Sequence, residues 1–168
     1  LERPSPTLET AFEKFHLELH GAAGPEPVLT LSHGLMPDAN WIPTVRMHSA
    51  CLFGESFLSR VCECRAQLDA SLAEVARRGG VIAYLFQEGR GIGLCGKMLA
   101  MELERVRDIN TVEAFRGLHH DPDPRSYAAA AAALRAKIAT ENIRLITNNP
   151  FKLAALASAG FNVVERVE

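Results

Sequence analysis

The sequence predicts an α/β (α+β) fold, a single domain in which a mixed β-sheet is flanked by helices. Two observations support this prediction. The first half of the chain contains short alternating or apolar segments separated by turns, which are typical of strands. The second half alternates apolar strand-like segments with segments of helical periodicity. We expect residues 1–168 to form one domain, with 1–27 as a less regular lead-in that contains the first strand.

The first half is expected to contribute three strands. Residues 15–20 alternate between apolar and polar side chains, and residues 28–31 follow after a turn-rich connection. A third strand is expected within 41–47, where Pro43 predicts an edge position or a bulge because proline cannot donate to a sheet. Residues 1–7, with two prolines, are expected to form a loose lead-in.

The second half is expected to alternate strands and helices. Gly79-Gly80 closes a helix, and a run of alanines from 128 to 133 is a strong helix former. The segment 111–125 is polar and is expected to be irregular. Helices are expected at about 68–78, 97–107, 126–139 and 150–160, and strands at 81–86, 143–147 and 161–164.

The composition narrows the range of partners. A hydrophobic content of 48% with 23% charged residues is ordinary for a globular domain. The net charge of −2 gives no broad basic surface, so no nucleic-acid partner is expected. No apolar run approaches the roughly 20 residues of a membrane span, so no membrane partner is expected either. Four cysteines without a secretory segment indicate reduced thiols and a cytoplasmic protein. The first residue, Leu1, indicates a trimmed native terminus.

Three of the four cysteines are clustered. Ten residues separate Cys51 from Cys62, and one residue separates Cys62 from Cys64. A disulfide between the last two would be strained, so shared coordination of a metal explains the cluster better. Three thiolates suit zinc and leave a fourth position open, which is the pattern of catalytic sites. The alternative is that the cysteines are simply buried as small apolar residues.

A glycine-rich turn follows the strand expected at 81–86. Residues 91–96 fit a dinucleotide fingerprint, but no βαβ unit delivers the acidic residue that this fingerprint needs. The same turn followed by Lys97 nearly fits a phosphate-binding P-loop, although Met98 lacks the hydroxyl that binds magnesium there. A plain tight turn is the third alternative. Glu88 and Arg90 place a carboxylate and a guanidinium at a strand end, where ligands commonly bind.

Several short motifs occur together in this chain, and their combination is specific to one protein family. They are Arg46-Met-His-Ser49, the Cys51…Cys62-Glu-Cys64 spacing, Gln67-Leu68, Gln87-Glu-Gly-Arg-Gly-Ile-Gly-Leu94, Thr111-Val-Glu-Ala114, Asp123-Pro-Arg125, Leu145-Ile-Thr-Asn-Asn-Pro150 with Lys152, and Val163-Val-Glu-Arg-Val167. Together they resemble the GTP cyclohydrolase II family, from about residue 28 to the end of the chain.

This resemblance implies a zinc enzyme that opens the imidazole ring of GTP. The three thiolates would hold one Zn²⁺ per chain, and Mg²⁺ would accompany the GTP phosphates while pyrophosphate is released. A homodimer is also implied. Zinc supplies hydroxide at neutral pH because it lowers the pKa of a bound water to about 7.

The resemblance also assigns the site residues. Those implied to bind GTP are Arg46, Met47, His48, Ser49, Ala50, Gln67, Glu88, Gly89, Arg90, Thr111, Thr147 and Lys152. Glu88 can accept from the guanine amino and ring N–H groups. The family assigns Arg125 as nucleophile toward the α-phosphate and Asp123 as its proton acceptor. Because a guanidinium is always protonated, a phosphate clamp is the alternative role of Arg125.

The chain departs from the family pattern at three positions. Met101 stands where the family has a catalytic tyrosine, Ala50 stands where it has glutamate, and Arg65 stands where it usually has glycine. Methionine cannot relay a proton. The hypothesis is therefore that the ring opens but the formyl group is retained, giving a formamidopyrimidine in place of the ordinary diaminopyrimidine.

Three other functions compete with this interpretation. A cytidine-deaminase-like hydrolase would need His-x-Glu and Cys-x-x-Cys, whereas this chain has His48-Ser-Ala50 and Cys-x-Cys. A zinc-stabilised nucleotide-binding protein without turnover is compatible with Met101 and Ala50. The same fold could also act on GTP in a specialised pathway other than riboflavin synthesis.

Overall fold

The computed structural model describes residues 6–38 and 40–167, and the fold is built on a mixed sheet of strand order β1-β2-β3-β5-β4-β6-β7. The strands are β1 (Thr7–Glu9), β2 (Lys14–His20), β3 (Val28–His33), β4 (Thr44–Ser49), β5 (Gly80–Leu85), β6 (Asn142–Leu145) and β7 (Asn162–Arg166). Pairing is antiparallel from β1 to β3 and between β3 and β5, whereas β5, β4, β6 and β7 are parallel. The predicted fold class, a mixed sheet flanked by helices, is confirmed.

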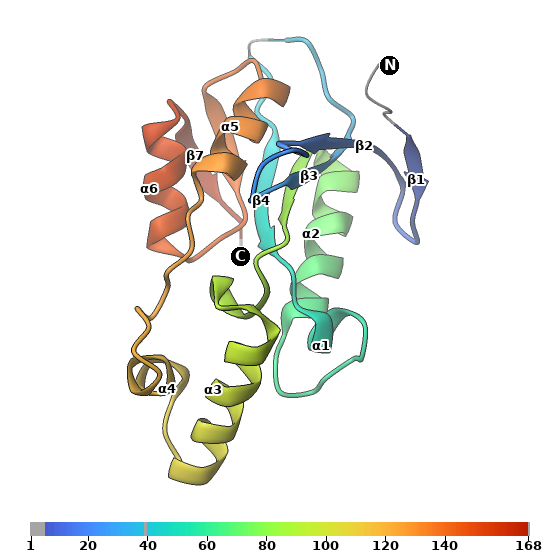
Figure 1. The fold of residues 1–168 in the computed structure, drawn as a ribbon. Helices are drawn as coiled ribbons and strands as arrows, with labels where there is room; N and C mark the ends of the chain where they lie inside the picture. The colour runs from blue at the N-terminus through green and yellow to red at the C-terminus, as the bar shows by residue number, and fades with distance from the viewer. Residues whose placement is uncertain (1–5, 39, 168) are drawn as a thin grey trace.

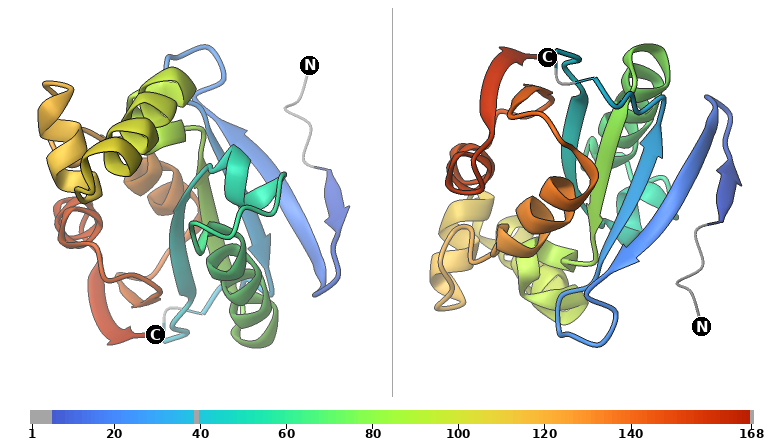
Figure 2. Two further views of the ribbon diagram at one scale, coloured as in Figure 1. Left: turned by 90° about the horizontal axis from the view of Figure 1, so that it is seen from below. Right: turned by 90° about the horizontal axis from the view of Figure 1, so that it is seen from above.

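Helices cover both faces of the sheet (Figures 1 and 2). They are α1 (Leu52–Glu55), α2 (Cys64–Arg78), the 3₁₀ turn η1 (Glu88–Gly91), α3 (Gly93–Arg107), α4 (Thr111–Gly117), α5 (Ala128–Lys137) and α6 (Pro150–Ser158). Helix α2 lies on one face, and α5 and α6 lie on the other. Helices α3 and α4 extend beyond the end of the sheet, on the same side as α1 (Figure 1).

The apolar residues of β5 contribute to the hydrophobic cores on both faces of the sheet. Val81 and Leu85 pack into the larger core under α5 and α6, whereas Ile82 packs with Val75 of α2 in the smaller core. Successive side chains of a strand point to opposite faces, so one short apolar strand serves both cores. This arrangement explains why β5 is almost wholly apolar, as expected of a strand buried on both sides, whereas Phe86 follows the strand and is 55% exposed.

Two expectations about local structure were wrong. Strand β4 is central, between β5 and β6, and is neither an edge nor a bulged strand. Pro43 precedes its first paired residue, Thr44, so the missing N–H falls outside the ladder. The segment 111–125 is not irregular throughout, because α4 begins it with a capping box formed by Asn110 and Glu113.

The N-terminal segment has more structure than expected. Residues 1–5 of the predicted lead-in lie outside the described residues, and β1 pairs with β2 from Thr7 onward.

Helix α3 begins at Gly93, inside the glycine-rich turn, and not at Lys97. Within the part of the chain that the structure describes, no helix is long and apolar enough to cross a membrane.

Candidate active site at the carboxyl edge of the parallel strands

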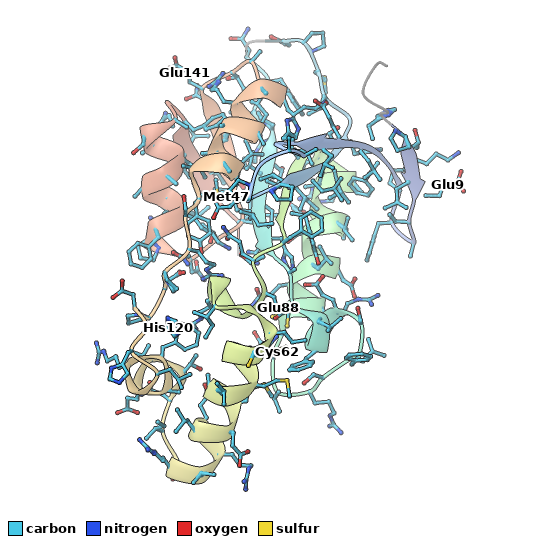
Figure 3. All side chains as sticks on the ribbon, viewed as in Figure 1. Glu9, Met47, Cys62, Glu88, His120 and Glu141 are labelled. Carbon is cyan, nitrogen blue, oxygen red and sulfur yellow. The ribbon has the colours of Figure 1, made fainter. Side chains whose placement is uncertain are left out.

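Three parallel strands end on the same edge of the sheet and deliver the candidate residues there. Strand β4 leads into Cys51, β5 leads into Glu88, and β6 leads into Thr147. Figure 3 shows Cys62 and Glu88 in one region beyond this edge, near α1 and α3. Ligands of open α/β sheets bind at the carboxyl ends of the strands, so the topology places these residues where a ligand site is expected.

The cysteine cluster has a geometry suited to a metal ion. The sulfurs of Cys51, Cys62 and Cys64 all lie within 4.8 Å of one another, and those of Cys51 and Cys62 are 3.7 Å apart. Tetrahedral coordination with bonds of about 2.3 Å requires sulfur atoms about 3.8 Å apart. The three thiols are free, and they stand at the N-cap of α1, in the following loop and at the start of α2.

Gly54 lets the backbone of α1 approach the sulfurs. A Cβ at this position would lie 2.8 Å from Cys62 Sγ and 3.3 Å from Cys51 Sγ. Both distances are shorter than ordinary van der Waals contact, so a side chain here would displace the sulfurs. The donor set and this close approach fit a thiolate-bound metal.

A lysine and a carboxylate lie directly beside the sulfurs. Lys97 Nζ is 3.1 Å from Cys51 Sγ and 2.7 Å from Glu88 Oε1. Burial alone would raise the pKa of the Cys51 thiol, but hydrogen bonds from Gly54 and Lys97 lower it below its ordinary value. Burial likewise opposes ionisation of Glu88, and the N–H of Leu52 with the Lys97 ammonium group lowers its pKa. The environment therefore favours the ionised forms of both acids.

A second carboxylate supports Cys51 from behind. Glu55 accepts hydrogen bonds from the Cys51 backbone N–H at 2.9 Å and from the Tyr84 hydroxyl at 2.7 Å, and it pairs with His48 Nε2 at 3.0 Å. Burial opposes ionisation of Glu55, but the bonds from His48 and Tyr84 lower its pKa. This network fixes the backbone that presents the first sulfur.

The cysteines line a cavity of about 800 Å³. Most of the residues predicted to bind substrate line the same cavity: Ser49, Ala50, Gln67, Glu88, Gly89, Arg90, Thr111 and Lys152, together with Met101 and Arg125. The cavity thus combines sulfur atoms with guanidinium and amino groups, which suits a ligand that carries both an electrophilic ring and phosphates.

Asp123 and Arg125 form a tight pair at the cavity wall. Arg125 donates to both carboxylate oxygens of Asp123, at 2.6 and 2.8 Å, and to Ser49 Oγ at 3.2 Å. Burial alone would raise the pKa of Asp123, but Arg125 and Asn149 together lower it to about 2. Such a carboxylate is a weak proton acceptor at neutral pH. Its two hydrogen bonds hold the guanidinium group of Arg125 in place.

A second cavity, of about 730 Å³, adjoins the first through Gln67 and Lys152. Arg46 and Thr147 line this second cavity. Arg46 donates to the Ile146 carbonyl and to Gln67 Oε1, both at 2.9 Å.

Lys152 is a buried amine. Its Nζ donates to the Met47 carbonyl at 2.8 Å, and its pKa is lowered to about 7, first by burial and then by the charges of Arg46 and Arg125. The pKa in the folded chain is thus below the ordinary 10.5. At pH values between these two pKa values, the unfolded chain binds more protons than the folded chain. The free energy of unfolding therefore rises with pH in this range.

We therefore expect Lys152→Met to remove a pH-dependent part of the stability. The free energy of unfolding in urea, measured from pH 6 to 10, should rise with pH more steeply in the wild type than in the variant. The difference should reach up to about 1.4 kcal/mol per pH unit above pH 7. Parallel curves for the two proteins would show that Lys152 carries its charge in the folded state throughout this range.

Three predicted residues line neither of the two cavities. Met47 is fully buried in the larger core, and His48 is 2% exposed and bonds to Glu55. Asp123 stands beside the cavity and acts on Arg125. Sequence reasoning assigned no site role to Lys97, although the near P-loop match contained it, and it did not single out Glu55.

The fold and the site define a mixed α/β protein in which three clustered thiols that could hold a metal ion line a cavity together with basic side chains. The family model of GTP cyclohydrolase II matches residues 2–168, and the chain belongs to the GTP cyclohydrolase II family. A GTP cyclohydrolase-2 of Pseudomonas syringae pv. tomato is 42% identical over 166 residues, covering 98% of this chain and 77% of that protein. A GTP cyclohydrolase-2 of Vibrio parahaemolyticus is 46% identical over 125 residues, covering 74% of this chain and 62% of that protein.

Longer proteins also match. The riboflavin biosynthesis protein RibBA of Staphylococcus epidermidis is 47% identical over 126 residues, 75% of this chain, and the match spans 32% of that relative's length. The crystal structure of RibBX, a two domain 3,4-dihydroxy-2-butanone 4-phosphate synthase from A. baumannii, superposes with a TM-score of 0.51 at 19% identity. It covers 99% of this chain and 39% of that chain. That likeness supports the fold alone.

Proposed function

We propose that the chain hydrolyses the imidazole ring of the guanine of GTP and releases pyrophosphate, with one zinc ion held by Cys51, Cys62 and Cys64. The observation that carries the proposal is that the thiol cluster and Arg125 line one cavity. Membership of the GTP cyclohydrolase II family supports GTP as the substrate. A zinc ion bound there would supply Lewis acidity that activates water toward the ring carbon.

The cations of the cavity would bind the phosphates. Arg125 and Lys152 line its wall, and Arg90 is held by the Pro122 carbonyl at 2.9 Å and by the ring of Phe115. Guanidinium groups match phosphate oxygens in pairs. Mg²⁺ would accompany the β- and γ-phosphates, because it binds substrate phosphates more readily than all-protein cages.

Arg125 would act as a clamp on the α-phosphate and not as a covalent nucleophile. Its guanidinium is always protonated, and the low pKa of Asp123 disfavours removal of a proton by that carboxylate. Donors already aimed at the charge that develops in a transition state stabilise it without reorganisation. The pairing of Asp123 with two N–H groups of Arg125 supports this role.

Glu88 would recognise guanine while holding Lys97. Three donors already occupy its carboxylate: the N–H groups of Leu52 and Gly89 and the Nζ of Lys97. An ionised carboxylate has about four lone-pair sites. Glu88 therefore keeps room for a further donor. The ring N–H of guanine or the amino group beside it would fill that position, whereas adenine has neither donor on the corresponding ring atoms.

Met101 lines the cavity on α3 and is 36% exposed there. Since a thioether cannot relay a proton, we infer that the wild type opens the ring and retains the formyl group. Met101→Tyr should then release about one formate per GTP consumed, a stoichiometry that follows from one formyl group per ring. Mass spectrometry of the nucleotide product together with a formate assay measures both outcomes.

Met98→Tyr is the matched control, because Met98 lies on the same helix, is 56% exposed and is not among the residues that line the cavity. Its product should equal that of the wild type. Stoichiometric formate release by the wild type would contradict the stalling hypothesis while leaving ring opening intact. GTP binding without any pyrophosphate release would instead favour a nucleotide-binding protein without turnover.

Family membership also supports a homodimer in the cytoplasm. Sedimentation equilibrium would test the dimer, for which twice the 18.3 kDa chain mass is expected.

A further inference from the structure

We propose that Lys97 is a positioning residue of the metal centre, whose ammonium group donates a hydrogen bond to the Cys51 thiolate and balances the negative charge of the three sulfurs. This inference rests on the proposed zinc site and deepens it. It assigns to Lys97 a role toward sulfur and not toward phosphate.

The position of Lys97 in the chain suggests a different role. It follows Gly91 and Gly96 with nearly the spacing of a P-loop, in which the lysine reaches the β- and γ-phosphates. In the structure its side chain is only 18% exposed and is held on three sides. The Nζ atom bonds to Cys51 Sγ and Glu88 Oε1 and lies 4.8 Å from the ring centre of Phe53.

The glycine turn provides the space for this orientation. A Cβ on Gly89 would lie 2.9 Å from the Cβ of Lys97, so a side chain there would push α3 away. Gly89 also has a φ of +59°, which favours glycine. The turn η1 thus brings Glu88 and Lys97 together and directs the amine to the sulfur.

Charge gives the physical reason for a cation at this point. Three thiolates exceed the charge of a divalent ion, so the zinc centre would be negative and would repel the phosphates of its own substrate. An ammonium group in contact with one sulfur neutralises that excess. Its hydrogen bond also withdraws electron density from the thiolate, which leaves the metal a stronger Lewis acid.

The test compares Lys97→Met with Arg107→Met. Arg107 lies at the end of the same helix and is exposed, so its replacement removes an equal charge far from the sulfurs. Zn²⁺ affinity is measured by competition with a chelator, and the absorption spectrum is recorded after Co²⁺ substitution. Lys97→Met should weaken zinc binding by about 10–100-fold, the usual effect of removing a partner of a metal ligand. Its sulfur-to-cobalt charge-transfer band should move to longer wavelength, because a sulfur without its hydrogen bond gives up electron density more easily.

Arg107→Met should match the wild type in both measurements. Lys97→Gln, which keeps an N–H donor but no charge, should fall between the wild type and Lys97→Met, and it replaces the methionine variant if that protein does not fold. Wild-type zinc affinity and an unshifted cobalt band in the Lys97 variants would overturn the inference, even if GTP turnover fell. A wild type that binds neither ion through its thiols would overturn the proposed zinc site as well, so the two failures are distinguishable.

Discussion

Replacing Cys62 by serine is expected to remove the zinc and to lower GTP turnover by roughly 10³-fold or more. Metal-ion catalysis supplies several kcal/mol of transition-state stabilisation, and each 1.36 kcal/mol is about a factor of ten in rate. Cys62 lies 3.7 Å from Cys51 across the cluster, so its loss leaves only two sulfurs. Zinc content by elemental analysis and pyrophosphate release from GTP are the two measurements.

Cys95→Ser is the matched control for this experiment. Cys95 is exposed on α3 and does not belong to the group of sulfurs within 4.8 Å of one another. Zinc content and turnover should remain at wild-type levels in this variant. Full turnover in a zinc-free Cys62→Ser protein would show that the cluster does not carry the chemistry.

Replacing Arg125 by alanine is expected to lower pyrophosphate release by about 10²–10³-fold, as the loss of one preorganised donor does in other active sites. Zinc content should not change, because Arg125 contacts Asp123 and Ser49 and none of the sulfurs. Steady-state turnover with GTP, together with elemental analysis, checks both parts of this expectation.

Asp123→Asn separates the clamp from a covalent role. The amide oxygen can still accept one N–H from Arg125, so positioning is weakened and turnover should fall less than in Arg125→Ala. If Asp123 instead removed a proton from Arg125, the asparagine variant would be as inactive as the alanine variant. A nucleotide adduct on Arg125, found by mass spectrometry during turnover, would also contradict the clamp. Arg116→Ala, which removes an exposed arginine of α4, is the control.

Much of the fold could be predicted because its signals are local. The apolar segment at β5, the alternation in β2 and the alanine run of α5 each show their own periodicity. Local signals were also missed. Asn110 and Glu113 form a capping box that could have indicated α4. The central position of β4 was not predictable in this way, because strand order depends on which distant segments pair.

The candidate site likewise contains features that the local sequence predicted and features that it did not. The three thiols, their spacing and the family resemblance were available from the sequence, since short motifs preserve residue type and spacing. The sequence alone thus predicted the three thiols as a donor set, and the structure brings their sulfurs within 4.8 Å of one another. It could not place the charges that act on that donor set.

Only the tertiary structure decided where those charged groups lie. Lys97 reaches Cys51 across 46 positions, Arg125 reaches Ser49 across 76, and Arg46 reaches the Ile146 carbonyl across 100. Each contact exists because β4, β5 and β6 end side by side at one edge of the sheet. Contacts of this kind are set by strand order and by the path of the connecting helices, and no local periodicity encodes them. For this reason the sequence predicted the three cysteines as metal ligands, whereas only the structure placed Lys97 and Glu55 in hydrogen-bond contact with Cys51.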